Sequence, residues 1–199
     1  TKADLPVERD TIFRIYSMTK PITAVAAKIL EERGLLKKED PVSKFLPEYA
    51  MCTVLQNGET VKMDREITIG DLLTMTSGLV YPDTDEAGSF MQGIFDEIES
   101  GIREGKGYST REVVRKIASV PLAFQPGSRW RYGLSTDVLG GIIEVITQKS
   151  LREFFKEEIL EPLQMKDTDF YVPEEKIGRL AQLYKKSEIE KKPFFERIA

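Results

Sequence analysis

Any catalysis by this chain has to proceed without imidazole. The 199-residue sequence has no histidine and a single cysteine, Cys52. The absence of histidine excludes Ser-His-Asp and Cys-His arrangements, two-histidine zinc proteases and nearly every catalytic zinc site. A nucleophile would need a lysine, a tyrosine or a carboxylate as its base. The sequence shows no cluster of metal ligands, so we expect neither a metal nor a cofactor.

A serine and a lysine at helical spacing are the strongest candidates for such a pair. Ser17-Met18-Thr19-Lys20 is the only Ser-x-x-Lys in the sequence. Residues three apart are neighbours on a helix, so the Lys20 amine can reach the Ser17 hydroxyl. The apolar spacing that follows predicts a helix over residues 21–33, whose free N–H groups favour a developing anion. We expect burial to lower the pKa of Lys20 toward neutrality, although a capping serine followed by a surface lysine also explains these four residues.

Tyr132 is a candidate for the third group of such a site. It follows the Pro126-Gly127 turn and precedes an apolar helix that begins at Thr136, which places it on a loop at a helix entrance. A phenol there could relay a proton or stabilise a deprotonated base. A buried aromatic residue whose hydroxyl holds the turn in place is the alternative interpretation.

The elements that would position these residues are mainly helical. Apolar spacing and capping residues predict helices in the segments 21–33, 68–73, 90–98, 110–117, 136–146 and 150–160. Strand signals are limited to Thr11–Ile15, Asp169–Val172 and a hairpin over Val54–Met63 that turns at Asn57-Gly58. Charges alternate over Lys185–Lys192, which we interpret as a solvated helix face or a loop.

Composition excludes several classes of function. The 29 Lys+Arg and 33 Asp+Glu residues give a net charge of −4, and this slight acidity argues against a nucleic-acid-binding protein, whose surface would be basic. No apolar run approaches the ~20 residues that a membrane helix needs, and no signal-peptide pattern opens the chain. A single cysteine excludes an internal disulfide. We favour a cytoplasmic location over a secreted or periplasmic one, which would apply if a leader had been removed.

Taken together, the two candidate segments resemble a known family of serine enzymes. The chain resembles the serine β-lactamase and penicillin-binding-protein superfamily, in the branch that holds class C β-lactamases, D-stereospecific peptidases and family VIII carboxylesterases. The matching segments follow the family's order: residues 10–22 (DTIFRIYSMTKPI), 40–42 (DPV), 46–47 (LP), 67–79 (ITIGDLLTMTSGL), 130–140 (WRYGLSTDVLG) and 161–168 (EPLQMKDT).

This resemblance implies a role for each candidate residue. Ser17 would be the acyl-accepting nucleophile, with its backbone N–H as half of the oxyanion hole, and Lys20 would be the general base. Tyr132 would carry a proton to the leaving group. Leu134 stands where class C β-lactamases usually carry an asparagine, so as a candidate substrate-binding residue it favours an ester over a lactam. The partner would be a small ester, amide or peptide-like molecule.

The resemblance covers only part of the family's fold. The family closes its site with a Lys-Thr-Gly or His/Trp-x-Gly strand beyond the tyrosine, and this sequence has neither that block nor the strands that usually precede the Ser-x-x-Lys helix. We therefore predict an α+β fold class: the predominantly helical portion of the β-lactamase/DD-peptidase-like serine hydrolase fold, with most of the central antiparallel sheet absent. It would be one partial domain over residues 1–199, with a variable acidic helical insertion at about 83–109. The remainder of its own fold could then be a partner.

The function that these features favour is acyl transfer to water through a Ser17 ester, with esterase-like specificity and poor activity in the isolated chain. A penicillin-binding protein, a D-amino-acid peptidase or a β-lactamase is the first alternative. A non-catalytic helical fragment or interaction module is the second. Acylation of Ser17 by a short-chain ester or by a labelled penicillin would distinguish the esterase from the first alternative. Sluggish or absent reaction of the folded protein with a fluorophosphonate would favour the second.

Overall fold

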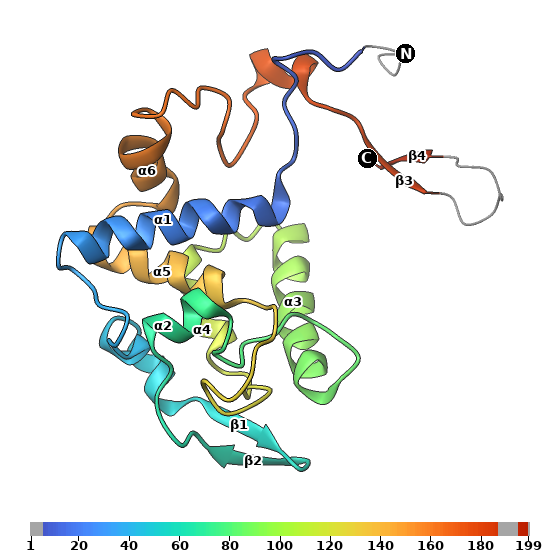
Figure 1. Cartoon of the computed structure of the whole chain (residues 1–199). Coiled ribbons are helices and arrows are strands. Elements are labelled where there is room, and N and C mark those ends of the chain that lie inside the picture. Colours follow the sequence, from blue (N-terminus) through green and yellow to red (C-terminus); the bar gives the residue numbers. More distant parts are fainter. Residues whose placement is uncertain (1–5, 187–194, 199) are drawn as a thin grey trace.

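The computed structural model describes residues 6–186 and 195–198, which form a mainly helical body (Figure 1). Its α-helices are α1 (Thr19–Glu32), α2 (Ile69–Thr74), α3 (Glu86–Arg103), α4 (Thr110–Ile117), α5 (Ser135–Thr147) and α6 (Leu151–Phe155). Short 3-10 turns lie at Tyr16–Met18, Val42–Lys44, Pro47–Met51 and Glu174–Arg179, and a π turn extends α6 over Lys156–Leu160. Helix predominates over strand, as predicted.

Capping residues determine where three of these helices begin. Thr68, Ser109 and Ser150 each accept a hydrogen bond from the backbone N–H three residues further on. The acidic side chain at that third position bonds back to the N–H of the capping residue. This reciprocal arrangement satisfies N–H groups that the first turn of a helix leaves free, so α2, α4 and α6 start at residues that the sequence itself specifies.

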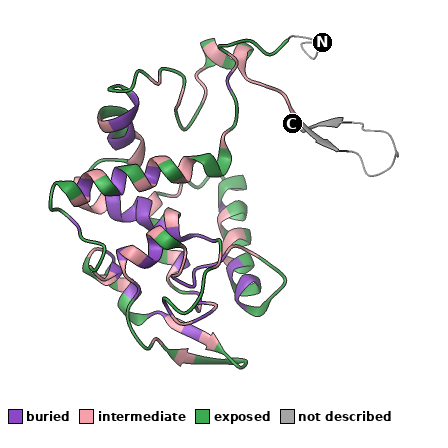
Figure 2. Cartoon of the chain, in the orientation of Figure 1, coloured by how far each residue is buried: buried purple, intermediate pink, exposed green. Residues whose placement is uncertain are grey.

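The α5 helix lies at the centre of the core. It packs against α1, α2, α4 and α6, and its residues Val138, Leu139, Ile142 and Ile143 are at most 1% exposed. Figure 2 shows buried residues where these helices face one another and exposed residues on their outer sides. Because four helices pack against α5, the start of α5 is fixed in place. The loop that ends at residue 134 is therefore held at the point where it joins the helix.

Strands in the described part of the chain form two antiparallel hairpins. β1 (Thr53–Gln56) pairs with β2 (Glu59–Lys62), and the Asn57-Gly58 turn between them has φ values of 54° and 78°. Two left-handed residues are what a type I′ hairpin turn requires, and the strands on either side of it pair, so this predicted hairpin is confirmed. β3 (Leu183–Lys186) pairs with β4 (Phe195–Ile198). No helix within residues 6–186 and 195–198 is long and apolar enough to cross a membrane.

Two predicted strands are wrong. The segment Thr11–Ile15 forms an isolated parallel bridge, between Ile12 and Leu180, instead of a ladder. The segment Asp169–Val172 forms bends, and the Asp169 carboxylate accepts hydrogen bonds from the Arg152 side chain. Period-two apolar spacing needs a neighbouring strand to become sheet. Among the described residues, the pairing of Thr11–Ile15 does not extend beyond the Ile12–Leu180 bridge, and Asp169–Val172 belongs to no ladder.

The charged segment Lys185–Lys192 also differs from its prediction in the part that is described. Lys185 and Lys186 belong to β3 and pair with Glu196 and Phe195. Alternating charges fit the two-residue period of a strand as well as a solvated loop, which is why the sequence pattern was ambiguous. Residues 187–192 lie outside the described residues.

Candidate active site

Ser17 lies on the 3-10 turn that leads directly into α1. The turn covers Tyr16–Met18, and α1 begins at Thr19, so the serine stands within two residues of the helix start, as predicted. Its side chain is exposed. The preceding Tyr16 has a φ of 43°, a left-handed conformation that is uncommon for a bulky residue and that concentrates at functional sites.

Lys20 and Tyr132 both reach the Ser17 hydroxyl. The Lys20 ammonium, in the first turn of α1, donates to Ser17 Oγ at 3.3 Å. The Tyr132 hydroxyl donates to the same oxygen at 2.6 Å. Tyr132 lies on the loop before α5, 115 residues away in sequence. The structure therefore brings the three predicted side chains into one cluster on the surface.

Tyr81 belongs to the same cluster, and sequence reasoning missed it. The Lys20 ammonium donates to the Tyr81 hydroxyl at 3.0 Å. The rings of Tyr81 and Tyr132 have centroids 5.8 Å apart, and Lys20 Nζ lies 5.5 and 4.8 Å from those two centroids, within the range of a cation–π interaction. Tyr81 follows the Ser77-Gly78-Leu79 block, which looks like a helix end and packing segment, so its type and spacing gave no sign of this role.

The two phenols change the proton affinity of Lys20. Burial is the largest single influence and lowers the pKa of Lys20, but hydrogen bonds to Tyr132 and Tyr81 and their negative potential together raise it above its ordinary value. The expectation of a lowered Lys20 pKa is therefore wrong. The reason is that the ammonium is half-buried and lies against two phenol oxygens, which stabilise its charged form.

Tyr132 shifts in the opposite direction. Hydrogen bonding with Ser17 is the largest influence on the Tyr132 phenol, and together with hydrogen bonding to Lys20 and the positive charge of Lys20 it lowers the pKa of that phenol. A lysine that holds its proton more tightly thus stands beside a tyrosine that gives its proton up more easily. These two groups interact closely, so their protons belong to the pair rather than to either residue.

Leu134 lies in the core and does not line the cluster. Its side chain is 2% exposed and belongs to the apolar core around α5. An apolar residue at the entrance of α5 gains more from burial there than from contact with solvent. The suggested substrate-binding role of Leu134 is therefore not supported, and its replacement of the asparagine has a packing explanation.

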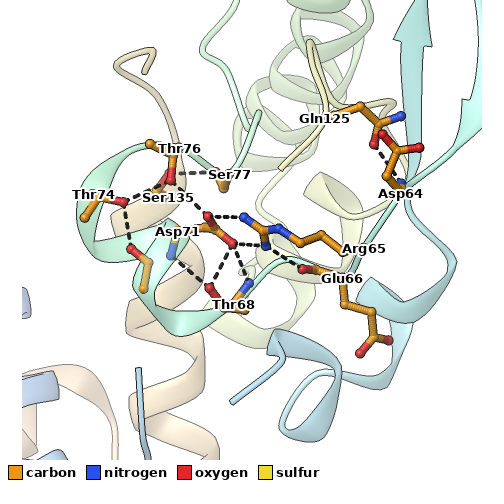
Figure 3. Close-up of polar contacts among 11 residues, drawn as sticks. Asp64, Arg65, Glu66, Thr68, Asp71, Thr74, Thr76, Ser77, Gln125 and Ser135 are labelled. Atoms are coloured by element: carbon orange, nitrogen blue, oxygen red, sulfur yellow. Dashed lines mark hydrogen bonds and ion pairs between the residues drawn. The ribbon is translucent and has the colours of Figure 1, made fainter. Parts of the chain in front are cut away.

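A charged hydrogen-bond network supports the turn between α2 and Tyr81 (Figure 3). The Asp71 carboxylate accepts two hydrogen bonds from Arg65, at 2.6 and 2.9 Å. It also accepts from the backbone N–H and hydroxyl of Thr68 and from the Thr76 hydroxyl. Burial alone would raise the pKa of Asp71, but these donors lower it to about 2. The network anchors Thr76, five residues before Tyr81.

Within the described ranges, no group of three or more His, Cys, Asp or Glu side chains could hold a metal ion. The buried Cys52 thiol is not a candidate nucleophile either, because burial raises its pKa to about 12 and only the thiolate is reactive.

The helical body, with a serine at a helix start, a lysine one turn on and a tyrosine facing both, has the arrangement that the family resemblance led us to expect. The chain belongs to the beta-lactamase family, whose model matches residues 1–194. The structure is thus the predominantly helical portion of the β-lactamase-like fold, as predicted.

Relatives of known name include an esterase. The chain is 38% identical to esterase EstB from Burkholderia gladioli over 172 residues, which cover 85% of this chain and 41% of that protein. It is 37% identical over 191 residues to protein Rv1367c from Mycobacterium tuberculosis, covering 94% of this chain and 46% of that one. The chain therefore spans about half the length of the curated relatives it matches.

Solved structures of named enzymes share this fold over nearly the whole chain. EstCE1, described as a hydrolase with promiscuous acyltransferase activity, superimposes with a TM-score of 0.77 at 29% identity, over 98% of this chain and 47% of its own. The simvastatin synthase LovD from Aspergillus terreus superimposes with a TM-score of 0.78 at 25% identity, over 97% of this chain and 47% of its own. The fold is thus shared with a hydrolase that has acyltransferase activity and with a simvastatin synthase.

Proposed function

We propose that the protein is a serine hydrolase that forms an ester on Ser17 and acts on small esters or amides. One observation carries this proposal: Ser17 Oγ lies 2.6 Å from the Tyr132 hydroxyl and 3.3 Å from Lys20 Nζ. A serine is a weak nucleophile until a neighbouring base takes its proton. Here two candidate bases contact the same hydroxyl oxygen.

In the proposed reaction, Lys20 and Tyr132 act as a coupled base. With Tyr132 deprotonated and Lys20 charged, Ser17 Oγ attacks the carbonyl carbon while its proton passes to the Tyr132 oxygen. The tetrahedral oxyanion then collapses, the bond to the alcohol or amine breaks, and Tyr132 returns the proton to that leaving group. Water repeats the same steps on the Ser17 ester, which releases the acid and restores the serine. The Lys20 charge stabilises the phenolate throughout.

An ester is the favoured substrate class. The named relatives include an esterase and a hydrolase with acyltransferase activity. Transfer of the acyl group to an alcohol instead of water would use the same Ser17 ester. A penicillin-binding or peptidase activity would appear as stable labelling of Ser17 by a penicillin.

Labelling with a fluorophosphonate tests the proposal directly. We expect intact-mass analysis to show one adduct on the wild-type chain and none on Ser17→Ala. Ser128→Ala, which changes an exposed serine outside the cluster, should label like the wild type. An adduct on Ser17→Ala, or no adduct on the folded wild type after prolonged reaction, would contradict the proposed nucleophile.

We also infer that the whole protein completes this site with residues that lie outside this 199-residue sequence. A hollow of about 500 Å³ lies beside the Tyr16–Met18 turn, lined by aromatic residues that include Phe13, Phe170 and Tyr171. The rest of the fold would fill it and supply the second oxyanion donor, whose loss typically costs about 10²–10³ in rate. We therefore expect feeble ester hydrolysis by the isolated chain. Equal rates for this chain and a protein of its relatives' full length would contradict this inference.

A further inference from the structure

The loops that carry Tyr81 and Tyr132 meet immediately beside both phenols. Gly133 follows Tyr132, and Leu79 and Val80 precede Tyr81. We propose that the contact between Gly133 and Leu79–Val80, together with a buried hydroxyl pair below it, is a clamp that positions the two phenols around Lys20. The catalytic part of this inference rests on the proposed function.

The first half of the clamp is a contact between backbones. A Cβ atom at Gly133 would lie 2.0 Å from the carbonyl oxygen of Leu79 and 2.9 Å from the Cα atom of Val80. Real Cβ atoms do not approach other atoms this closely, and backbone atoms cannot rotate away as the end of a side chain can. Any side chain at position 133 therefore has to push the two loops apart.

The second half of the clamp is a pair of serine hydroxyls. Ser77 and Ser135 are both fully buried, and their Oγ atoms lie 2.8 Å apart (Figure 3). Ser77 Oγ also accepts a hydrogen bond from the backbone N–H of Leu79 at 3.2 Å. Each hydroxyl satisfies the other, so removal of one leaves a buried polar group without its partner.

Both ends of the clamp are attached to rigid parts of the molecule. Ser135 is the first residue of the central helix α5. Ser77 adjoins Thr76, which the Asp71 network holds. A second strut links the loops two residues away, where the Arg131 backbone N–H donates to the Met75 carbonyl at 3.0 Å. The separation of the two loops is therefore fixed from several directions.

A displaced clamp would change proton transfer without removing any reacting group. Tyr132 and Tyr81 reach Lys20 from opposite loops, with ring centroids 5.8 Å apart. Widening the loops would lengthen the 2.6 Å contact between Tyr132 and Ser17. A misplacement of about 1 Å can cost about 10²-fold in rate, so Gly133 and the serine pair act as positioning residues.

Comparison of Gly133→Ala with Gly93→Ala tests the clamp. A Cβ at Gly93, in α3, would meet nothing within 4 Å, so this control makes the same chemical change in open space. The readouts are the thermal unfolding midpoint, the fluorophosphonate labelling rate and the pKa of Tyr132 from NMR of ¹³C-labelled tyrosine. The Tyr132 signal is assigned by its loss in Tyr132→Phe.

We expect folded Gly133→Ala to show a higher Tyr132 pKa than the wild type, because a displaced phenol loses the hydrogen bonds with Ser17 and Lys20 that lower it. Its labelling rate should fall about 10²-fold, while Gly93→Ala keeps both values. An unchanged Tyr132 pKa in folded Gly133→Ala would overturn the clamp. If the chain labels poorly for every variant, the pKa comparison still decides, since it does not depend on catalysis.

The double variant Ser77→Ala/Ser135→Ala serves if Gly133→Ala does not fold. Replacing both serines avoids leaving one buried hydroxyl without the other, but it also removes the acceptor of the Leu79 N–H, so we expect a measurable loss of stability. We expect the Tyr132 pKa to rise in this variant as well, by less than in Gly133→Ala. A folded double variant with the wild-type Tyr132 pKa would overturn the contribution of the serine pair.

Discussion

Replacing Asp71 by Asn removes the charge at the centre of the network beneath the site. The carboxylate is 7% exposed and binds Arg65 through two hydrogen bonds. Asparagine has nearly the same size as aspartate. Its NH₂ group cannot accept a hydrogen bond, so the groups that donate to the second carboxylate oxygen of Asp71 lose their acceptor. Arg65 is about half exposed, so its guanidinium can be hydrated after the change, and the loss falls mainly on the Asp71 side.

The pKa of Asp71 sets the size of the loss. Folding lowers it from 3.8 to about 2, and each pKa unit corresponds to about 1.36 kcal/mol. The charge therefore contributes roughly 2 kcal/mol to the free energy of unfolding at pH 7. Because the folded pKa is the lower one, this contribution is present above pH 4 and is lost as the pH falls through 2, with roughly half remaining at pH 3.

Urea denaturation of the wild type and Asp71→Asn at pH 7, 4 and 3 measures this difference. We expect the variant to be less stable by roughly 2 kcal/mol at pH 7, with a smaller gap at pH 3. Glu104→Gln, on an exposed carboxylate at the end of α3, should change stability little at any of these pH values. A gap at pH 7 that does not narrow by pH 3 would refute the assignment of the stability to the Asp71 charge.

Three further predictions concern single residues around the site. Tyr81→Phe removes a hydrogen bond that raises the pKa of Lys20, so that pKa, followed by NMR of ¹³C-labelled lysine, should fall; a rise would contradict the cluster described here. Met75→Gly should stabilise the chain by about 0.5–1 kcal/mol in urea, because Met75 ends α2 with a left-handed φ of 58°. Gly78→Ala should destabilise it by about 2–4 kcal/mol, since Gly78 has a φ of 85° and its Cβ would lie 2.6 Å from the Phe124 carbonyl oxygen; an unchanged midpoint would show that the turn can relax.

Local features of the fold were predictable because their causes lie a few residues apart. The capping boxes at Thr68 and Ser150 and the Asn57-Gly58 turn each depend on neighbours in sequence. The Ser17–Lys20 contact is local too, since it follows from three-residue spacing at a helix start. The convergence with Tyr132 is not local, and it was expected because of the family resemblance rather than because of spacing.

The features that sequence reasoning missed depend on packing between distant segments. Tyr81 joins the cluster because the loop before it rests on Gly133, a contact that no local pattern records. The sign of the Lys20 pKa shift follows from having two phenols beside it instead of one. Leu134 looked like a substrate contact, yet its apolar side chain turns into the core. Each error came from considering a residue without the distant segments that pack around it.

The order of elements along the chain also bears on how such a protein can change over evolution. Helix α3 lies between Tyr81 and α4, so it falls within the stretch of chain that separates Leu79–Val80 from Gly133, the two sides of the contact described above. The start of α3 is linked to the Tyr132 loop, because Arg131 forms ion pairs with Asp83 and with Asp85, the capping residue of α3. We therefore expect changes in the later turns of α3, but not at its start, to leave the geometry of the two phenols intact. New specificities could then arise by exchange of these later turns, while the cluster of Ser17, Lys20, Tyr81 and Tyr132 is inherited unaltered.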